Sequence, residues 1–150
     1  MGISEDIKQK VFKSEISKAI INVHFTNNWL HERQLTIFKP YGLTEPQYNA
    51  LRILRGQYPN PSTINLIIDR MMDRMSNASR IVDKLEKKGL VLREQSEYDR
   101  RAVDVLITEK GLELLKELDV KMDEWELEFK GISELEASQL NELLDKFRAK

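Results

Sequence analysis

The residues best suited to binding chemistry are polar side chains that recur at helical spacing along one predicted helix. Asn77, Arg80 and Lys84 are three and four positions apart, so a helix would place them in one row. Asparagine can pair bidentately with adenine and arginine with guanine, and small hydroxyls such as Ser76 and Ser79 can reach bases or phosphates. The row therefore indicates a surface for double-stranded DNA, although an ordinary solvent-exposed helix face would have the same composition.

A second polar cluster lies between two segments of strand-like composition, residues 90–94 and 102–107. These segments predict a β-hairpin whose tip places the adjacent Arg100 and Arg101 beside Asp99. An extended hairpin can carry an arginine into a minor groove, with Asp99 holding one arginine while the other contacts DNA. The alternative is a polar turn, in which a surface Asp–Arg pair has little energetic value.

The segment that must position these two clusters reads as a series of short helices. Thr44 is placed to cap a helix that has Pro46 in its first turn and Gln47 at the capping-box position. Two further helices follow at 63–70 and 76–88, joined by a tight connection, and Gly89 ends the second. Two short helices joined by a turn have the outline of a helix-turn-helix unit, although many helical hairpins share it.

Longer helices are expected on both sides of this segment. No proline or glycine interrupts residues 5–38, which read as one helix, and 108–129 and 134–149 predict two more. The first is much longer than the usual helix of about 11–12 residues. Part of its apolar stripe is therefore expected to pack on a second copy of the chain. A two-fold dimer would also hold two DNA-reading helices about 34 Å apart, the spacing of successive major grooves.

Composition narrows the function classes further. The chain has 150 residues, the usual size of one domain, and its 24 Lys plus Arg against 25 Asp plus Glu leave a net charge of −1. The net charge therefore does not indicate nucleic-acid binding, and any such binding must depend on where individual lysines and arginines lie. The chain has no cysteine, which excludes disulfides, thiolate zinc sites and thiol redox sensing. With no apolar signal core or membrane span, we expect a soluble, cytoplasmic protein.

The two histidines are the remaining candidates for a metal site or for catalysis. His24 and His31 are seven positions apart, which is too far for shared ligation across ordinary helix turns, and the H-E-x-x-H pattern is absent. We therefore expect both to be structural or pocket-lining, and we expect no metal and no cofactor. No phosphate-binding glycine loop or activated nucleophile is evident in the sequence. The chain is thus predicted not to be an enzyme, with a small helical enzyme using His24 or His31 as a rival.

Four segments together resemble the multiple antibiotic resistance regulator (MarR) family. They are residues 44–48 (TEPQY), 76–91 (SNASRIVDKLEKKGLV), 99–101 (DRR) and 106–111 (LITEKG). Their order and spacing cover nearly the whole chain. The resemblance implies a mainly α fold with a small β-hairpin wing, in which helices at about 5–38 and 108–149 form the dimer.

The resemblance also assigns roles within a single domain, residues 1–150. It implies a winged helix-turn-helix lobe at about 44–107, with 76–88 as the recognition helix. It makes Arg101 the first choice for the minor-groove arginine and Arg100 the second. Similar regulators commonly bind pseudo-palindromic operators, and many release DNA when a small aromatic or phenolic ligand enters a cleft beside the DNA lobe.

Five residues lie where the resemblance places that cleft: His24, Phe25, Trp29, Tyr41 and Tyr48. Aromatic residues at such spacing more often belong to a plain hydrophobic core, which is the interpretation we favour for them. Met71, Met72 and Met75 can likewise line a pliable pocket or fill gaps. The sequence thus predicts a sequence-specific DNA-binding transcriptional regulator, a repressor released by a small-molecule effector. The alternative is a winged-helix protein-interaction module that has lost DNA binding.

Overall fold

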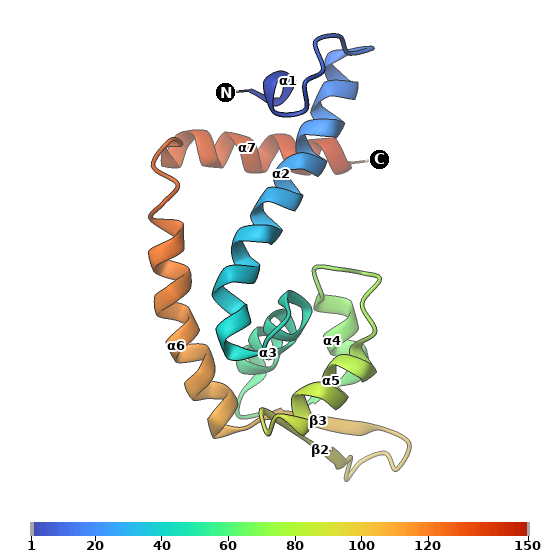
Figure 1. Ribbon diagram of the computed structural model, residues 1–150. Coiled ribbons are helices and arrows are strands. Elements are labelled where there is room, and N and C mark those ends of the chain that lie inside the picture. The colour runs from blue at the N-terminus through green and yellow to red at the C-terminus, as the bar shows by residue number, and fades with distance from the viewer. Residues whose placement is uncertain (1, 150) are drawn as a thin grey trace. The chain divides into compact units, whose positions relative to one another are not determined.

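The protein, described by a computed structural model over residues 2–149, divides into two compact units, Met1–Leu115 and Lys116–Lys150. Helices dominate both units (Figure 1). The first unit holds α1 (Ile3–Asp6), α2 (Glu15–Phe38), a 3-10 helix (Lys39–Tyr41), α3 (Glu45–Gln57), α4 (Ile64–Arg70), α5 (Ala78–Lys87), three strands and the beginning of α6 (Glu109–Glu126). The second unit holds the rest of α6 and α7 (Glu134–Arg148).

The N-terminal segment differs from the single helix expected over residues 5–38. The four-residue α1 ends at Asp6, and Lys8 adopts the left-handed region with φ of 56°. The second helix begins only after Ser14, whose extended backbone and side-chain oxygen cap it by accepting a hydrogen bond from Ser17 N at 3.0 Å. The prediction of one uninterrupted helix was therefore wrong, because apolar spacing does not register a cap.

The start of α3 follows the sequence pattern closely. The Thr44 side chain accepts a hydrogen bond from the Gln47 backbone, and the Gln47 side chain bonds the Thr44 backbone in return. This capping box places Tyr48 and Leu51 on the buried face of the helix. The centroid of the Tyr48 ring lies 4.5 Å from that of Phe38, which is fully buried at the end of α2. Aromatic packing therefore joins the end of α2 to α3.

The strands form a three-stranded antiparallel sheet with the order β1-β3-β2. The expected hairpin is present as β2 (Val91–Gln95) and β3 (Val103–Ile107), and it extends away from the helices of this unit (Figure 1). The short strand β1 (Ser62–Thr63) pairs with β3, although Pro59, Asn60 and Pro61 predict a loop over residues 56–62. Two residues are too few to show strand alternation, so this pairing has no signal of its own in the sequence.

The two short helices expected after α3 are present as α4 and α5. Thr63 caps α4. The spacing of Ile64, Ile67 and Ile68 predicts that all three face inward. Ile67 is completely buried, but the Ile68 side chain is 40% exposed. Gly89 ends α5 with φ of 73°, a conformation that a residue with a Cβ rarely adopts.

An arginine on the hairpin holds it against α5. Arg93 on β2 forms ion pairs with Asp83 and Glu86, two carboxylates of α5. Glu86 also accepts a hydrogen bond from the backbone N–H of Arg93 at 3.1 Å. The side-chain hydrogen bond from Arg93 lowers the pKa of Glu86, and the same bond raises the pKa of Arg93. Because this network uses both backbone and side chain, it sets where β2 lies along α5.

The second unit consists of the later part of α6 together with α7. A capping box between Ser133 and Glu136 starts α7, and the hydrogen bond from the Ser133 backbone lowers the pKa of Glu136. The rings of Trp125 and Phe129 pack edge to face, with their centroids 5.2 Å apart. Over the described part of the chain, every helix is too short or too polar to cross a membrane.

Gly111 allows the first turn of α6 to lie directly on the segment that leads into β2. A Cβ at this position would lie 2.4 Å from the Leu90 carbonyl oxygen and 2.7 Å from Ile107 Cγ1. The preceding Thr108 bridges the same two segments, since its hydroxyl donates to Gly89 O and accepts from Gly111 N. The close approach leaves no room for any side chain at Gly111.

We expect Gly111→Ala to lower the free energy of unfolding by about 1–3 kcal/mol, the usual cost of overpacking a tight contact. Gly56→Ala is the matched control, because a Cβ at Gly56 meets nothing within 4 Å and alanine favours the helix. Urea denaturation at one fixed protein concentration measures both variants. Equal stability of the two variants would contradict the assigned contact.

The Arg93 network predicts a loss of stability in acid. A carboxyl whose pKa is lowered by folding stabilises the folded chain above its ordinary pKa, and this contribution disappears as the pH falls through the lowered value. We therefore expect Arg93→Gln to lose less stability than the wild type between neutral and acidic pH, as measured by urea unfolding at each pH. Lys121→Gln, which removes a surface pair with Glu124, is the control and should retain the wild-type dependence.

Candidate DNA-binding surface and adjoining pocket

The orientation of α5 follows from its narrow apolar face. Ala78 is 2% exposed, and Val82 and Leu85 are completely buried. Because residues three and four positions apart share one helix face, the opposite face must point outward. Four of the predicted DNA-contacting residues are exposed there: Asn77, Ser79, Arg80 and Lys84. Ser76 is half-buried instead, and its hydroxyl has no hydrogen-bond partner among the described residues.

Asn77 has a structural role that the sequence interpretation did not include. It is the N-cap of α5, and its side-chain oxygen accepts a hydrogen bond from Arg80 N at 3.1 Å. A bidentate contact with adenine needs both the oxygen and the nitrogen of the amide. Asn77 can therefore read a base in that way only by giving up the cap, whereas the Arg80 side chain has no such competing contact within residues 2–149.

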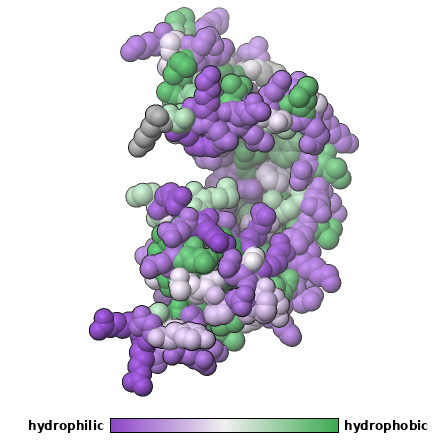
Figure 2. Space-filling model, turned by 180° about the vertical axis from the view of Figure 1, so that it is seen from behind, coloured by the Kyte–Doolittle hydropathy of each residue, from purple (hydrophilic) through white to green (hydrophobic). Residues whose placement is uncertain are grey.

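The hairpin tip is organised by hydrogen bonds to its backbone. Asp99 Oδ1 accepts from Arg101 N at 2.9 Å, and the Gln95 side chain donates to the Arg100 carbonyl at 2.8 Å. Asp99 therefore supports the tip through the main chain; within residues 2–149 it forms no ion pair with either arginine side chain, contrary to the expectation that it holds one. Arg100 and Arg101 are both exposed. The hairpin tip forms a hydrophilic projection in the space-filling view (Figure 2).

Lys88 joins the other end of α5 to the start of α3. Its ammonium donates to the Gly42 carbonyl and, at 2.9 Å, to the side-chain oxygen of Gln47. Burial lowers the pKa of Lys88, and the nearby positive charge of Lys84 lowers it further. Neither Lys88 nor Arg93 is thus available as a simple surface cation, because intramolecular contacts engage both. Sequence reasoning missed these two roles, since each pairs residues on different elements.

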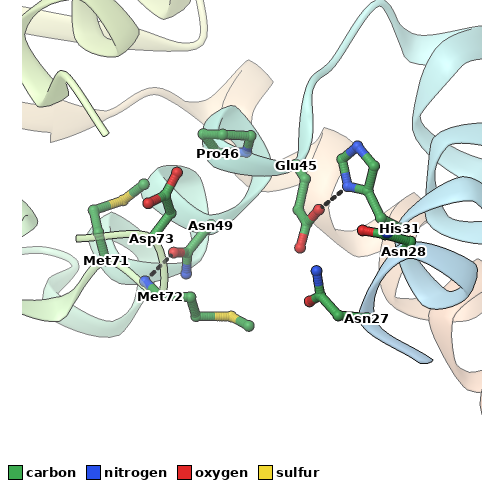
Figure 3. Close-up of a pocket in the computed structure, with 9 residues that line it drawn as sticks. All are labelled: Asn27, Asn28, His31, Glu45, Pro46, Asn49, Met71, Met72 and Asp73. Atoms are coloured by element: carbon green, nitrogen blue, oxygen red, sulfur yellow. Dashed lines mark hydrogen bonds and ion pairs between the residues drawn. The ribbon is translucent and has the colours of Figure 1, made fainter. Parts of the chain in front are cut away.

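A pocket of about 460 Å³ adjoins the connector between α4 and α5, residues 71–77 (Figure 3). Its lining comes from Asn27, Asn28 and His31 of α2, Glu45, Pro46 and Asn49 of α3, and Met71, Met72 and Asp73 of the connector. His31 Nδ1 lies 2.5 Å from Glu45 Oε2, which joins α2 to the first turn of α3. Asn49 Oδ1 accepts a hydrogen bond from Met72 N at 2.9 Å, which joins α3 to the connector.

The residues expected to line an effector cleft lie elsewhere. His24, Phe25, Trp29, Tyr41 and Tyr48 are all absent from the lining of this pocket. Tyr48 packs in the core against Phe38, and His24 is exposed on α2. Phe25 and Trp29 are each 36% exposed, and the Trp29 ring carries the Arg33 guanidinium 4.2 Å from its centroid.

Three other residues named from the sequence line the pocket, whereas Met75 does not. His31 has the pocket-lining role that was one of the alternatives for the histidines, and Met71 and Met72 also contribute. The contributing residues come from three separate parts of the chain. Within residues 2–149, no three His, Cys, Asp or Glu side chains are grouped so that they could hold a metal ion.

Comparison with known sequences identifies the family. A sequence model of the MarR family matches residues 43–103. The transcriptional repressor MprA of Escherichia coli K12 is 32% identical over 104 residues, which are 69% of this chain but only 58% of MprA. The transcriptional regulator MgrA of Staphylococcus aureus is 30% identical over 110 residues, which cover 73% of both chains.

Solved structures show the same fold. A MarR transcription factor from Planctomyces limnophilus matches with a TM-score of 0.68 at 32% identity, covering 90% of this chain and 96% of that protein. BpsR of Bordetella bronchiseptica, whose DNA binding is regulated by 6-hydroxynicotinic acid, matches with a TM-score of 0.67 over 85% of this chain and 98% of BpsR. At 21% identity, the second likeness shows the fold alone.

These matches confirm the mainly helical winged-helix fold with its small sheet. The matched relatives are transcriptional regulators, so the family is not one of enzymes. The chain belongs to the MarR family of transcriptional regulators.

Proposed function

We propose that the chain binds double-stranded DNA in a sequence-specific manner as a homodimer and acts as a repressor under small-molecule control. The observation that carries this proposal is the burial of Ala78, Val82 and Leu85, because it directs Arg80 and Lys84 outward. In this proposal α5 enters the major groove and the hairpin arginines reach the adjacent minor groove. Residues 1–150 act together as one functional domain.

Local charge supports DNA binding despite the net charge of −1. Arg80, Lys84, Arg100 and Arg101 are exposed, whereas Arg93 and Lys88 are engaged within the chain. Binding should therefore weaken steeply with salt, because each cation that neutralises a phosphate releases a counterion. A pseudo-palindromic operator fits a two-fold dimer, since each lobe would read one half-site.

Homodimer formation is supported by apolar side chains left exposed on helices of both units. On α2, Ile16 is 64% exposed and Ile20 is 43% exposed. On α7, Leu135 is 70% exposed and Leu143 is 63% exposed. Leaving such side chains in water is unfavourable, and runs of them mark surfaces that bind other protein. A second copy of the chain would cover them.

Repression and effector control draw support from the relatives and from the pocket. MprA is a repressor, and a small molecule regulates DNA binding by BpsR. The pocket volume of about 460 Å³ lies within the usual range of small-molecule sites. Because the pocket adjoins the connector to α5, a bound ligand would act on the element that reads DNA.

DNA binding is tested by selecting bound fragments from the host genome and measuring affinity by fluorescence polarisation at several salt concentrations. We expect Arg101→Ala to weaken binding about tenfold with little change in base preference. Arg80→Ala should cost about 1–3 kcal/mol and relax the preference at one base pair. Asn77→Ser retains a capping hydroxyl while removing the amide, so any loss of base preference would isolate base contact from helix stability.

Arg52→Ala on α3 is the charge-matched control, because Arg52 is exposed on an element that does not carry the proposed surface. It should bind as the wild type does. No binding by the wild type at low salt, or equal affinity of wild type, Arg80→Ala and Arg101→Ala, would favour the alternative. That alternative is a winged-helix protein-interaction module without DNA binding.

The dimer is tested by changing one exposed apolar residue on α7. We expect Leu143→Glu to halve the mass measured by light scattering after size exclusion, because a carboxylate at a buried interface is strongly unfavourable. Leu92→Glu is the control, since Leu92 is 52% exposed on β2, outside the proposed dimer helices. A wild-type chain that is monomeric at micromolar concentration would refute the proposed dimer.

A further inference from the structure

We infer that the pocket beside the connector binds a small organic cation, and that the ligand acts on α5 through Asp73 and Asn49. The preferred ligand is an ammonium group on a compact apolar body. The binding part of this inference stands on the pocket itself, whereas the regulatory part rests on the proposed function. The resemblance alone suggests aromatic or phenolic ligands, whereas the charge of this pocket favours a cation.

The lining of the pocket favours positive charge. Glu45 and Asp73 contribute carboxylates, and the lining contains no lysine or arginine. Its one basic group, His31, is already paired with Glu45. An anionic ligand would have to lose its hydration beside two carboxylates without gaining a cation, which is unfavourable. An ammonium ion would instead meet carboxylate and amide oxygens, for which it is a suitable donor.

The rest of the lining suits a compact apolar body. Met71, Met72 and Pro46 contribute apolar surface to the pocket. Thioether side chains are flexible and polarisable, and they adapt to ligands of irregular shape. Met72 is 79% exposed, so its side chain has room to move over a bound ligand. The amide groups of Asn27 and Asn28 supply polar contacts from α2.

Asp73 links the pocket to the start of α5. Its Oδ1 accepts a hydrogen bond from Met75 N at 2.9 Å, and its carbonyl accepts one from Ser76 N at 3.2 Å. Ser76 directly precedes Asn77, the cap of α5. A cation that draws the Asp73 carboxylate toward itself moves Oδ1 away from Met75 N and weakens this hydrogen bond. Binding would therefore alter the turn that places the N-terminus of α5.

Asn49 provides a second connection from the same pocket. Its side-chain oxygen accepts a hydrogen bond from Met72 N, and Met72 directly follows Met71, the C-cap of α4 (Figure 3). A ligand whose donor displaces Met72 N from this oxygen would release the connector from α3. Since a ligand shifts a conformational equilibrium only by its differential affinity for the two states, both contacts must differ between free and bound forms. The two hydrogen bonds provide that difference.

The ligand class is tested with three probes of nearly equal size: phenethylammonium, 3-phenylpropionate and 2-phenylethanol. Each is titrated into the full-length 15N-labelled chain, and the NMR signals of the Asn49 side chain and the Met72 and Asp73 backbones are followed. We expect saturable shifts with phenethylammonium and at least tenfold weaker binding of 3-phenylpropionate. Equal or tighter binding of the carboxylate, or no saturable binding of the ammonium up to millimolar concentration, overturns the inference.

Matched variants test whether the carboxylates of the pocket cause the preference for a cation. Asp73→Asn removes the carboxylate but keeps an oxygen that can accept from Met75 N, so the connector should remain folded. We expect it to bind phenethylammonium about tenfold more weakly and to discriminate less against 3-phenylpropionate. Glu45→Gln should act in the same direction. Glu113→Gln removes an exposed carboxylate of α6 outside the pocket and should bind as the wild type does. Equal losses in Asp73→Asn and Glu113→Gln would contradict a local effect.

The regulatory part has a separate readout. Phenethylammonium should change the operator affinity of the wild type several-fold and leave that of Asp73→Asn unchanged. If the chain binds both probe and DNA but the probe does not alter DNA affinity, the regulatory part is wrong. If the chain never binds DNA, the proposed function fails, while the NMR titration still decides the ligand class.

Discussion

The structure depends most directly on the burial of one narrow stripe of α5. A ten-residue helix with Ala78, Val82 and Leu85 in the core can take only one rotation about its axis. Each buried valine or leucine contributes about 1.5–3 kcal/mol to stability. Turning the helix to expose them would therefore cost several times the free energy that any single surface contact could return. The direction of Arg80 and Lys84 is therefore a consequence of core packing. A surface suited to DNA follows from the same apolar pattern that folds the lobe.

Polar contacts then fix the helix along its length. Asn77 caps its start, Arg93 reaches Asp83 and Glu86 from the hairpin, and Lys88 joins its end to α3. Two of these contacts engage cations that the composition alone would count toward DNA binding. In a chain with a net charge of −1, this makes the position of each remaining arginine more important than their number.

The pocket and the proposed DNA-reading helix share one segment, the connector of residues 71–77. Asp73 lines the pocket and also holds the turn before the cap of α5, while Asn49 holds the beginning of the same connector. A short segment held by a few exposed hydrogen bonds changes conformation at lower cost than a packed core. Ligand control through this segment would therefore leave the core of the lobe intact.

Local patterns in the sequence determined most of the fold. The capping boxes at Thr44 and Ser133, the hairpin and the buried face of α5 are predictable, because each depends on residues within a few positions of one another. The break before α2 was missed because apolar spacing does not detect the cap at Ser14. Tertiary structure alone decided that β1 pairs with β3 and that Arg93 and Lys88 are engaged. It also formed the pocket, since Asn27, Glu45 and Asp73 come from three separate segments and only folding brings them together.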